Sequence, residues 1–114
     1  MALRLAPRGL VTSEYVLVEA FILIEARLGA EAALRFWGGI RAGAALLVGV
    51  LGRDLAQAWS IVHAWPDHRF GLVDATSFAL MERLGIRDAL SLDDHFRIYR
   101  FGERRRSRFR VYPA

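Results

Sequence analysis

The stretch from Phe70 to Phe96, FGLVDATSFALMERLGIRDALSLDDHF, decides the fold because it encodes a complete helix-to-strand unit. Asp74 begins a pattern with apolar residues at helical spacing, and Gly85 ends it. The apolar run from Ala89 to Leu92 then predicts a buried strand that ends at Asp93. A helix of about eleven residues covers roughly 16 Å, and a strand of about five residues returns over a similar distance. Asp74 and Asp93 are therefore expected at the same end of the unit, an arrangement that suggests a metal site.

The length and composition of the chain predict one domain over residues 1–114. Its 114 residues, 54% of them apolar, are enough for one hydrophobic core and too few for two. The sequence contains no cysteine, so disulfides and thiolate metal ligands are excluded. Any metal ion must therefore be held by oxygen or imidazole ligands.

The net charge of +4 comes wholly from arginine, because the 16 basic residues include no lysine. The charge is uneven, and from Arg97 onward seven arginines face one acid, Glu103. Such a segment attracts phosphates or an acidic partner. The alternative is a solvated, arginine-rich surface without a specific ligand.

The first 25 residues superficially resemble an export signal, since Arg4 and Arg8 precede an apolar stretch. Glu14 and Glu19 argue against this interpretation, because the apolar region of a signal is normally uncharged. The stretch is also shorter than the roughly 20 apolar residues that a membrane span needs. We therefore expect a soluble protein in the cytoplasm.

Other segments predict strands and helices in alternation. The predicted strands are Leu10–Val11, Ala44–Leu51 and Arg108–Tyr112, and the predicted helices are Ser13–Leu28, Glu31–Ile40 and one that begins near Asp54 and ends before Pro66. In the last helix, Leu55, Trp59 and Val62 are expected to face the core. The continuous apolar run at 44–51 favours a central strand of a parallel sheet. This order predicts an α/β layer sandwich, in which ligands bind at the carboxyl ends of the strands.

Glu19 is the third acidic candidate because it interrupts an otherwise apolar helix. A carboxylate in such a run must face a polar cavity, pair with an arginine or bind a cation. If Glu19, Asp74 and Asp93 shared one pocket, they would repel one another unless a divalent cation neutralised them. Mg²⁺ fits this set, since it takes a few carboxylates and keeps waters, one of which can attack a phosphodiester.

Each acid also has a structural interpretation. Asp74 can cap its helix, because aspartate is a favoured residue at that position. Glu19 can form an internal ion pair with Arg83 or Arg87. The three histidines lack the spacing of metal ligands, so packing or surface roles are favoured for them.

Three segments resemble PIN-domain ribonucleases, especially the VapC-type toxins of bacterial toxin and antitoxin pairs. These segments are LVTSEYVLVEAFILIEARLG, LVDATSFALMERLGIRDALSLDDHF and the closing FRVYP. The resemblance implies a PIN-like three-layer sandwich in which Glu19, Asp74 and Asp93 match the metal-binding acids and Thr76 or Ser77 assists. It also implies hydrolysis of single-stranded RNA that depends on Mg²⁺ or Mn²⁺ and is restrained by a cognate antitoxin.

The chain departs from this family at its beginning. Members normally open with a strand that carries the first catalytic aspartate, and nothing of the kind precedes Leu10. In the family that strand lies in the middle of the sheet, between the strand at 10–13 and the one ending at Asp93. We therefore expect a missing N-terminal central strand, and remaining strands that close up, swap between protomers or borrow a segment. A homodimer or an altered sheet is the expected result.

Three functions follow from these observations. The first is a metal-dependent endoribonuclease of the PIN family, a toxin component whose activity is impaired because its first acidic ligand is absent. The alternative is a catalytically inactive PIN remnant that binds an antitoxin or RNA. The third is a helix-rich dimer in which the acids serve only as caps and ion pairs.

Overall fold

The structure is a computed structural model of the chain, and it describes residues 2–6, 9–67, 70–91, 99–105 and 107–112. The helices are α1 (Glu14–Leu28), α2 (Ala30–Gly39), α3 (Gly52–Ala64) and α4 (Leu72–Leu84), with a π-helical turn at Ile40–Ala44 and a 3-10 turn at Glu103–Arg105. The strands are β1 (Ala2–Ala6), β2 (Gly9–Ser13), β3 (Leu46–Val48), β4 (Asp88–Ser91) and β5 (Arg110–Tyr112).

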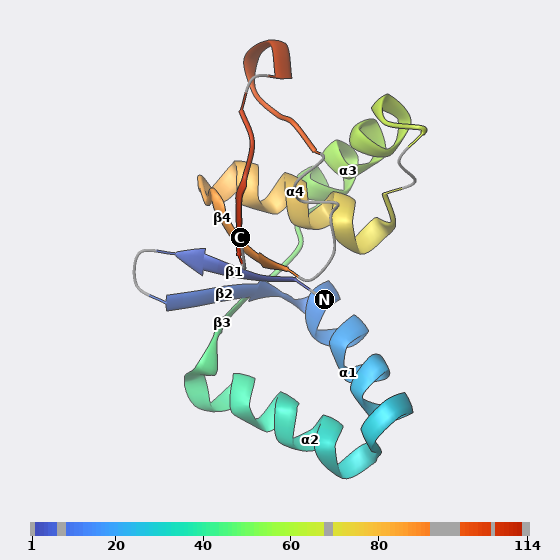
Figure 1. The fold of residues 1–114 in the computed structure, drawn as a ribbon, viewed down its shortest axis with the longest axis vertical. Helices are drawn as coiled ribbons and strands as arrows, with labels where there is room; N and C mark the ends of the chain where they lie inside the picture. Colours follow the sequence, from blue (N-terminus) through green and yellow to red (C-terminus); the bar gives the residue numbers. More distant parts are fainter. Residues whose placement is uncertain (1, 7–8, 68–69, 92–98, 106, 113–114) are drawn as a thin grey trace.

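The five strands form one sheet in the order β3-β2-β1-β4-β5. The pairs β2–β3 and β4–β5 are parallel, whereas β1 is antiparallel to both β2 and β4. Four strands therefore point the same way, and β1 runs against them in the centre. Figure 1 shows α3 and α4 on one side of this sheet and the α1–α2 hairpin on the other. The predicted α/β fold with a mostly parallel sheet is confirmed.

The centre of the sheet corrects one expectation. We expected no strand before Leu10, but β1 lies between β2 and β4, with Arg4 in register with Val11 on one side and Ala89 on the other. The chain thus fills the expected gap with its own first residues. The physical reason is that an open gap would leave two rows of backbone donors and acceptors unpaired.

β3 corrects a second expectation. The run at 44–51 was predicted to form a central strand, yet β3 lies at the edge of the sheet, where it pairs with β2 alone. Leu46 and Leu47 are 64% and 44% exposed. A continuous apolar run therefore marked an uncovered edge strand here, not a strand buried on both faces.

Three helix ends follow their predicted signals, whereas α4 begins at Leu72, two residues before the predicted start at Asp74. Ser13 caps α1, since its Oγ accepts a hydrogen bond from the Val16 N–H at 3.2 Å. Gly29 ends α1 with a φ of 92°, and Gly85 ends α4 in the left-handed region with a φ of 69°. These residues fix both ends of α1 and the end of α4 relative to the sheet.

The core lies between the sheet and the α3–α4 layer. Four of its members are the aromatic residues Phe70, Phe78, Tyr99 and Phe109, each at most 4% exposed. The rings of Phe78 and Tyr99 stack with centroids 4.3 Å apart and an interplanar angle of 3°. Burying these rings supplies a large part of the apolar area removed from water.

The buried face of α3 differs from the predicted one. Asp54, Ala58 and Ile61 are buried at helical spacing, whereas Leu55 and Trp59 are 40% and 71% exposed. Leu55 and Trp59 thus lie beside the buried face of this helix, whereas Val62 packs against the core as predicted. Within the described ranges no helix is both long and apolar enough to cross a membrane.

Candidate functional site

Glu19 lies in the second turn of α1, after Ser13 has ended β2 and capped the helix. Its side chain is half-buried. It lines a surface hollow of about 500 Å³ between α1 and the first turn of α4. The lining residues are Tyr15, Val18, Glu19, Ile22, Leu23 and Val73. The lining of this hollow is largely apolar. Glu19 is the lining residue that carries a carboxylate.

Asp74 directly follows Val73 and is half-buried in the first turn of α4. The helix N-cap is Gly71, so Asp74 is not the capping residue that its structural interpretation required. A carboxylate in this position is favoured by the positive end of the helix dipole. The structure therefore places Glu19 and Asp74 on two adjoining helices that border one hollow.

Asp93 lies outside the described residues. The described part of β4 ends at Ser91, and β4 runs parallel to β2 because both are antiparallel to β1. The carboxyl end of β4 therefore lies at the same edge of the sheet as Ser13, where α1 begins. Among the described residues no three histidine, aspartate or glutamate side chains gather closely enough to hold a metal ion. Asp93 is not one of these residues, so the predicted set of three acids stays a prediction.

Both arginines considered as partners for Glu19 have other contacts. Arg83 donates from Nε to Asp54 Oδ1 at 2.8 Å and from Nη2 to Asp54 Oδ2 at 3.0 Å. The guanidinium of Arg87 lies 5.6 Å from the ring centroid of Phe101. These arginines therefore belong to the packing of α4 and the C-terminal segment.

Asp54 is a buried charged residue that the sequence did not reveal as such. Burial alone would raise its pKa, but hydrogen bonds from Arg83 and from the Leu51 N–H, together with the charges of Arg83 and Arg53, hold the pKa below its ordinary value. The sequence feature that could have indicated the burial of Asp54 is its helical spacing from Ala58 and Ile61. Asp54 is consequently a structural carboxylate that ties α3 to α4.

The two hydroxyls expected to assist the acids differ in their contacts. Thr76 Oγ1 lies 2.7 Å from the Leu72 carbonyl and 3.1 Å from the Val73 carbonyl, to which it donates within its own helix. Ser77 Oγ is buried and has no hydrogen-bond partner among the described residues. A buried hydroxyl without a partner costs roughly 1–3 kcal/mol and calls for an explanation. Ser77 is therefore the stronger candidate for a polar role near the acids.

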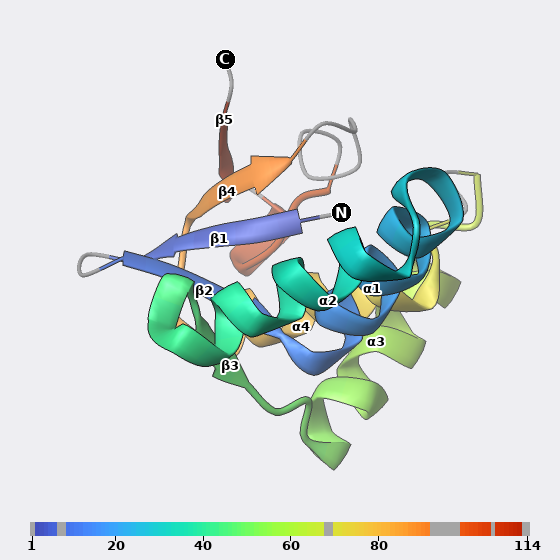
Figure 2. The same cartoon turned by 90° about the horizontal axis from the view of Figure 1, so that it is seen from below.

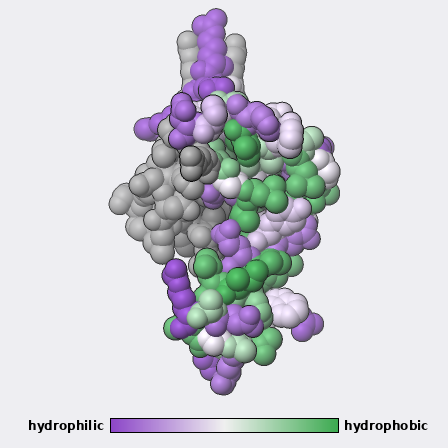
Figure 3. Space-filling model, turned by 90° about the vertical axis from the view of Figure 1, so that its right-hand side faces the viewer, coloured by the Kyte–Doolittle hydropathy of each residue, from purple (hydrophilic) through white to green (hydrophobic). Residues whose placement is uncertain are grey.

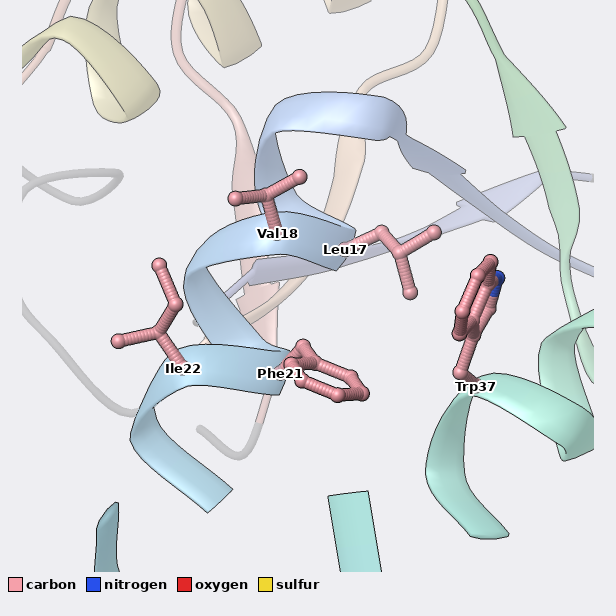
Figure 4. Close-up of a pocket in the computed structure, with 5 residues that line it drawn as sticks. All are labelled: Leu17, Val18, Phe21, Ile22 and Trp37. Carbon is pink, nitrogen blue, oxygen red and sulfur yellow. The ribbon is translucent and has the colours of Figure 1, made fainter. Parts of the chain in front are cut away.

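An apolar pocket of about 230 Å³ lies next to Glu19, between α1 and α2. Figure 4 shows Leu17 and Phe21 of α1 pointing toward Trp37 of α2, with Val18 and Ile22 beside them. Val18 and Ile22 are 56% and 57% exposed. Figure 3 shows apolar side chains gathered on the lower part of this face, at the height of the hairpin in Figure 1. The molecule thus presents an apolar surface next to Glu19.

Comparison with known proteins gives two similar curated relatives from Mycobacterium tuberculosis. The 23S rRNA-specific endonuclease VapC20 is 35% identical over 91 residues, which are 79% of this chain and 69% of that protein. Ribonuclease VapC26 is 35% identical over 85 residues, which are 75% of this chain and 63% of that protein. No family model matches the sequence.

The fold comparison agrees with the sequence comparison. The crystal structure of VapC20 from Mycobacterium tuberculosis, described as a sarcin-ricin loop cleaving toxin, matches with a TM-score of 0.63 and 34% sequence identity. The match covers 73% of this chain and 64% of the VapC20 chain, so this chain spans about two thirds of that relative's length. On sequence and on fold, the chain belongs to the VapC family of PIN-domain ribonucleases.

Proposed function

We propose that this chain is a metal-dependent endoribonuclease in which Glu19, Asp74 and Asp93 hold Mg²⁺ or Mn²⁺ against an RNA phosphate. The observation that supports the proposal most strongly is the hollow that Glu19 and Val73 share, because it sets Glu19 beside the turn that carries Asp74. In the sequence Asp93 follows the end of β4 by two residues, and the carboxyl end of β4 lies at the edge of the sheet where α1 begins. Three acids from three elements would then surround one site.

The residues present fit such an ion. All three are hard oxygen donors, and Mg²⁺ prefers oxygen ligands. A bound divalent ion would polarise the phosphodiester and lower the pKa of a water that attacks it. Asp74 lies in the first turn of α4, where the helix dipole favours a negative charge. Ser77, one turn of α4 beyond Asp74, offers a hydroxyl without a partner among the described residues.

We propose further that this activity is weak, because of the composition of the central strand. β1 takes the central position that the first acidic strand occupies in the family, but its sequence, ALRLA, contains no acid. β1 therefore supplies no counterpart of the family's first acidic ligand. Fewer carboxylates bind a divalent cation less tightly.

The alternative function is a binding module without turnover, and the apolar pocket between α1 and α2 favours it. Exposed apolar patches of this kind mark contacts with other proteins. The apolar lining of this pocket suits the apolar side of an antitoxin peptide that contacts Leu17, Phe21 and Trp37. It equally suits a second copy of this chain in a homodimer. This surface would remain intact when the acids no longer cleave RNA.

A cleavage assay separates the two functions. The full chain is incubated with a labelled single-stranded RNA in Mg²⁺, in Mn²⁺ and in EDTA, alongside Glu19→Gln, Asp74→Asn and Asp93→Asn. Glu31→Gln is the matched control, since this glutamate is exposed on α2 and pairs with Arg35. The proposal predicts slow, metal-dependent cleavage that each of the three substitutions reduces at least tenfold and Glu31→Gln does not change. Cleavage that survives Asp74→Asn, or that persists in EDTA, would contradict it.

A further inference from the structure

A second cleft lies away from the acids, between α3, the end of α4 and residues 99–105. Its volume is about 200 Å³, which suits a group smaller than a drug-sized ligand. It is lined by Gln57, Ser60, Ile61, Ala64, Trp65, Glu82, Tyr99, Arg100, Phe101, Gly102 and Arg105. In contrast to the apolar pocket of α1 and α2, this cleft combines arginine side chains with aromatic rings.

Cation and ring lie together at the mouth of the cleft. The guanidinium of Arg105 lies 5.0 Å from the ring centroid of Trp65. Arg100, half-buried, donates from Nη1 to the Tyr99 carbonyl at 3.1 Å. Trp65 also packs on Tyr99 with ring centroids 5.9 Å apart, so the core holds its ring in place. The cleft therefore offers a fixed aromatic face beside two positive charges.

The backbone that carries Arg105 is strained. Arg104 and Arg105 have φ angles of 56° and 53°, the two positive values among the described non-glycine residues. Such residues cost roughly 1–3 kcal/mol each and persist only where the surroundings enforce them. Here Phe101 and Ser107 close the turn with two backbone hydrogen bonds of 3.0 Å. The turn thus holds Arg105 over Trp65, although both arginines are exposed to solvent.

A tyrosine hydroxyl engages the acidic residue of the cleft. The Tyr99 hydroxyl donates to Glu82 Oε2 at 2.6 Å. Burial raises the pKa of Glu82, and the hydrogen bond from Tyr99 partly offsets that rise. The Glu82 carboxylate is thus already engaged by Tyr99, while the Arg105 guanidinium lies over the Trp65 ring.

We infer that this cleft binds one nucleotide of a single-stranded RNA, with its phosphate on Arg105 and its base against Trp65. Proteins that bind single strands combine a positive groove with aromatic faces for the bases. Glu82 follows Asp74 by eight residues of α4, which places the cleft roughly 12 Å farther along the helix and about 80° around it. An RNA several nucleotides long can therefore contact both places. The choice of RNA as ligand rests on the proposed function.

The test measures binding without cleavage. The full chain carries Trp37→Phe and Trp59→Phe, two exposed positions, so that Trp65 is the fluorescent residue. A single-stranded RNA of twelve nucleotides is titrated in EDTA at low salt, and its anisotropy and the emission of Trp65 are followed. Arg105→Gln removes the charge over Trp65. Arg104→Gln is the matched control. It removes a positive charge from the neighbouring residue, which has a similar positive φ but does not line the cleft.

The inference predicts that RNA quenches Trp65 and that Arg105→Gln weakens binding about tenfold, the loss expected for one charge-assisted contact. Arg104→Gln should weaken it no more than twofold. If the two substitutions weakened RNA binding equally, the effect would come from net charge alone and the inference would be overturned. Quenching of Trp65 by inorganic phosphate without binding of RNA would also overturn it. Because EDTA prevents metal-dependent cleavage, failure of the nuclease proposal appears in the cleavage assay and leaves this result unaffected.

Discussion

Arg83 of α4 and Asp54 of α3 form a bidentate ion pair that ties the two helices together. The Arg83 Nε lies 2.8 Å from Asp54 Oδ1, and the Asp54 carboxylate is 2% exposed. The Leu51 N–H donates to the other carboxylate oxygen at 2.8 Å. The same interaction thus joins the start of α3 to the C-terminal half of the helix that carries Asp74.

Removing the cation should cost more than removing the carboxylate. Arg83→Gln leaves the buried Asp54 charge uncompensated, and we expect a loss of about 3 kcal/mol in the free energy of unfolding. Asp54→Asn should cost less, because Arg83 is 21% exposed and can be hydrated. Urea unfolding measures both. Arg53→Gln, the exposed neighbour of Asp54, is the control, and a loss as large as that of Arg83→Gln would refute a specific pair.

The same pair predicts a loss of stability in acid. The pKa of Asp54 is held below its ordinary value, so the native state binds fewer protons there than the unfolded chain. The stabilisation is therefore present above the unfolded pKa of about 3.9 and is lost as the pH falls through the lower, native pKa. Urea midpoints measured from pH 7 down to pH 3 should fall more steeply for the natural chain than for Asp54→Asn. Parallel curves would show that Asp54 has no part in the acid transition.

The contact between Tyr99 and Glu82 predicts a pH dependence of the opposite sign, because the pKa of Glu82 is raised whereas that of Asp54 is lowered. Burial raises the pKa of Glu82, and Tyr99→Phe removes the hydrogen bond that offsets part of this rise. The pKa of Glu82 should therefore rise further in the variant. Since a raised carboxyl pKa favours the protonated native state, the variant should lose about 1 kcal/mol mainly above pH 5, where Glu82 is charged. Carboxyl chemical shifts followed by NMR against pH check the direction, and a lowered pKa would contradict it.

Local signals made α1 and α4 predictable. Ser13, Gly29 and Gly85 are capping residues whose effect depends on their own backbone, so the sequence predicted both ends of α1 and the end of α4. Glu19 and Asp74 could be assigned to one region for the same reason, since each lies near the start of such a helix. Asp93 was predicted from the strand ahead of it and lies beyond the described end of β4.

Pairing between distant segments was not predictable in this way. Ala2–Ala6 consists of alanine, leucine and arginine, which are strong helix formers, yet it forms the central strand. Its partners lie in β2 and in β4, more than 80 residues later. The edge position of β3 and the burial of Asp54 likewise depend on which elements meet in space.

The central position of β1 can be tested by hydrogen exchange. Leu3→Pro removes a backbone donor and cannot be accommodated in a central strand. The amides of β2 and β4 should then exchange faster, while those in the middle of α4 keep their protection. Leu3→Val, which introduces a residue that favours strands, is the matched control and should preserve protection. Unchanged exchange of the Val11 and Ala89 amides in Leu3→Pro would show that β1 does not occupy this place.

The most direct test of the central claim is a Mn²⁺ binding isotherm of the full chain, recorded by electron paramagnetic resonance without RNA. If Glu19, Asp74 and Asp93 hold one ion together, the chain should bind one Mn²⁺ weakly, and Glu19→Gln, Asp74→Asn and Asp93→Asn should each reduce the affinity at least tenfold, with Glu31→Gln unchanged. Binding that is equal in all five proteins, or absent from the natural chain at millimolar Mn²⁺, would contradict a shared metal site.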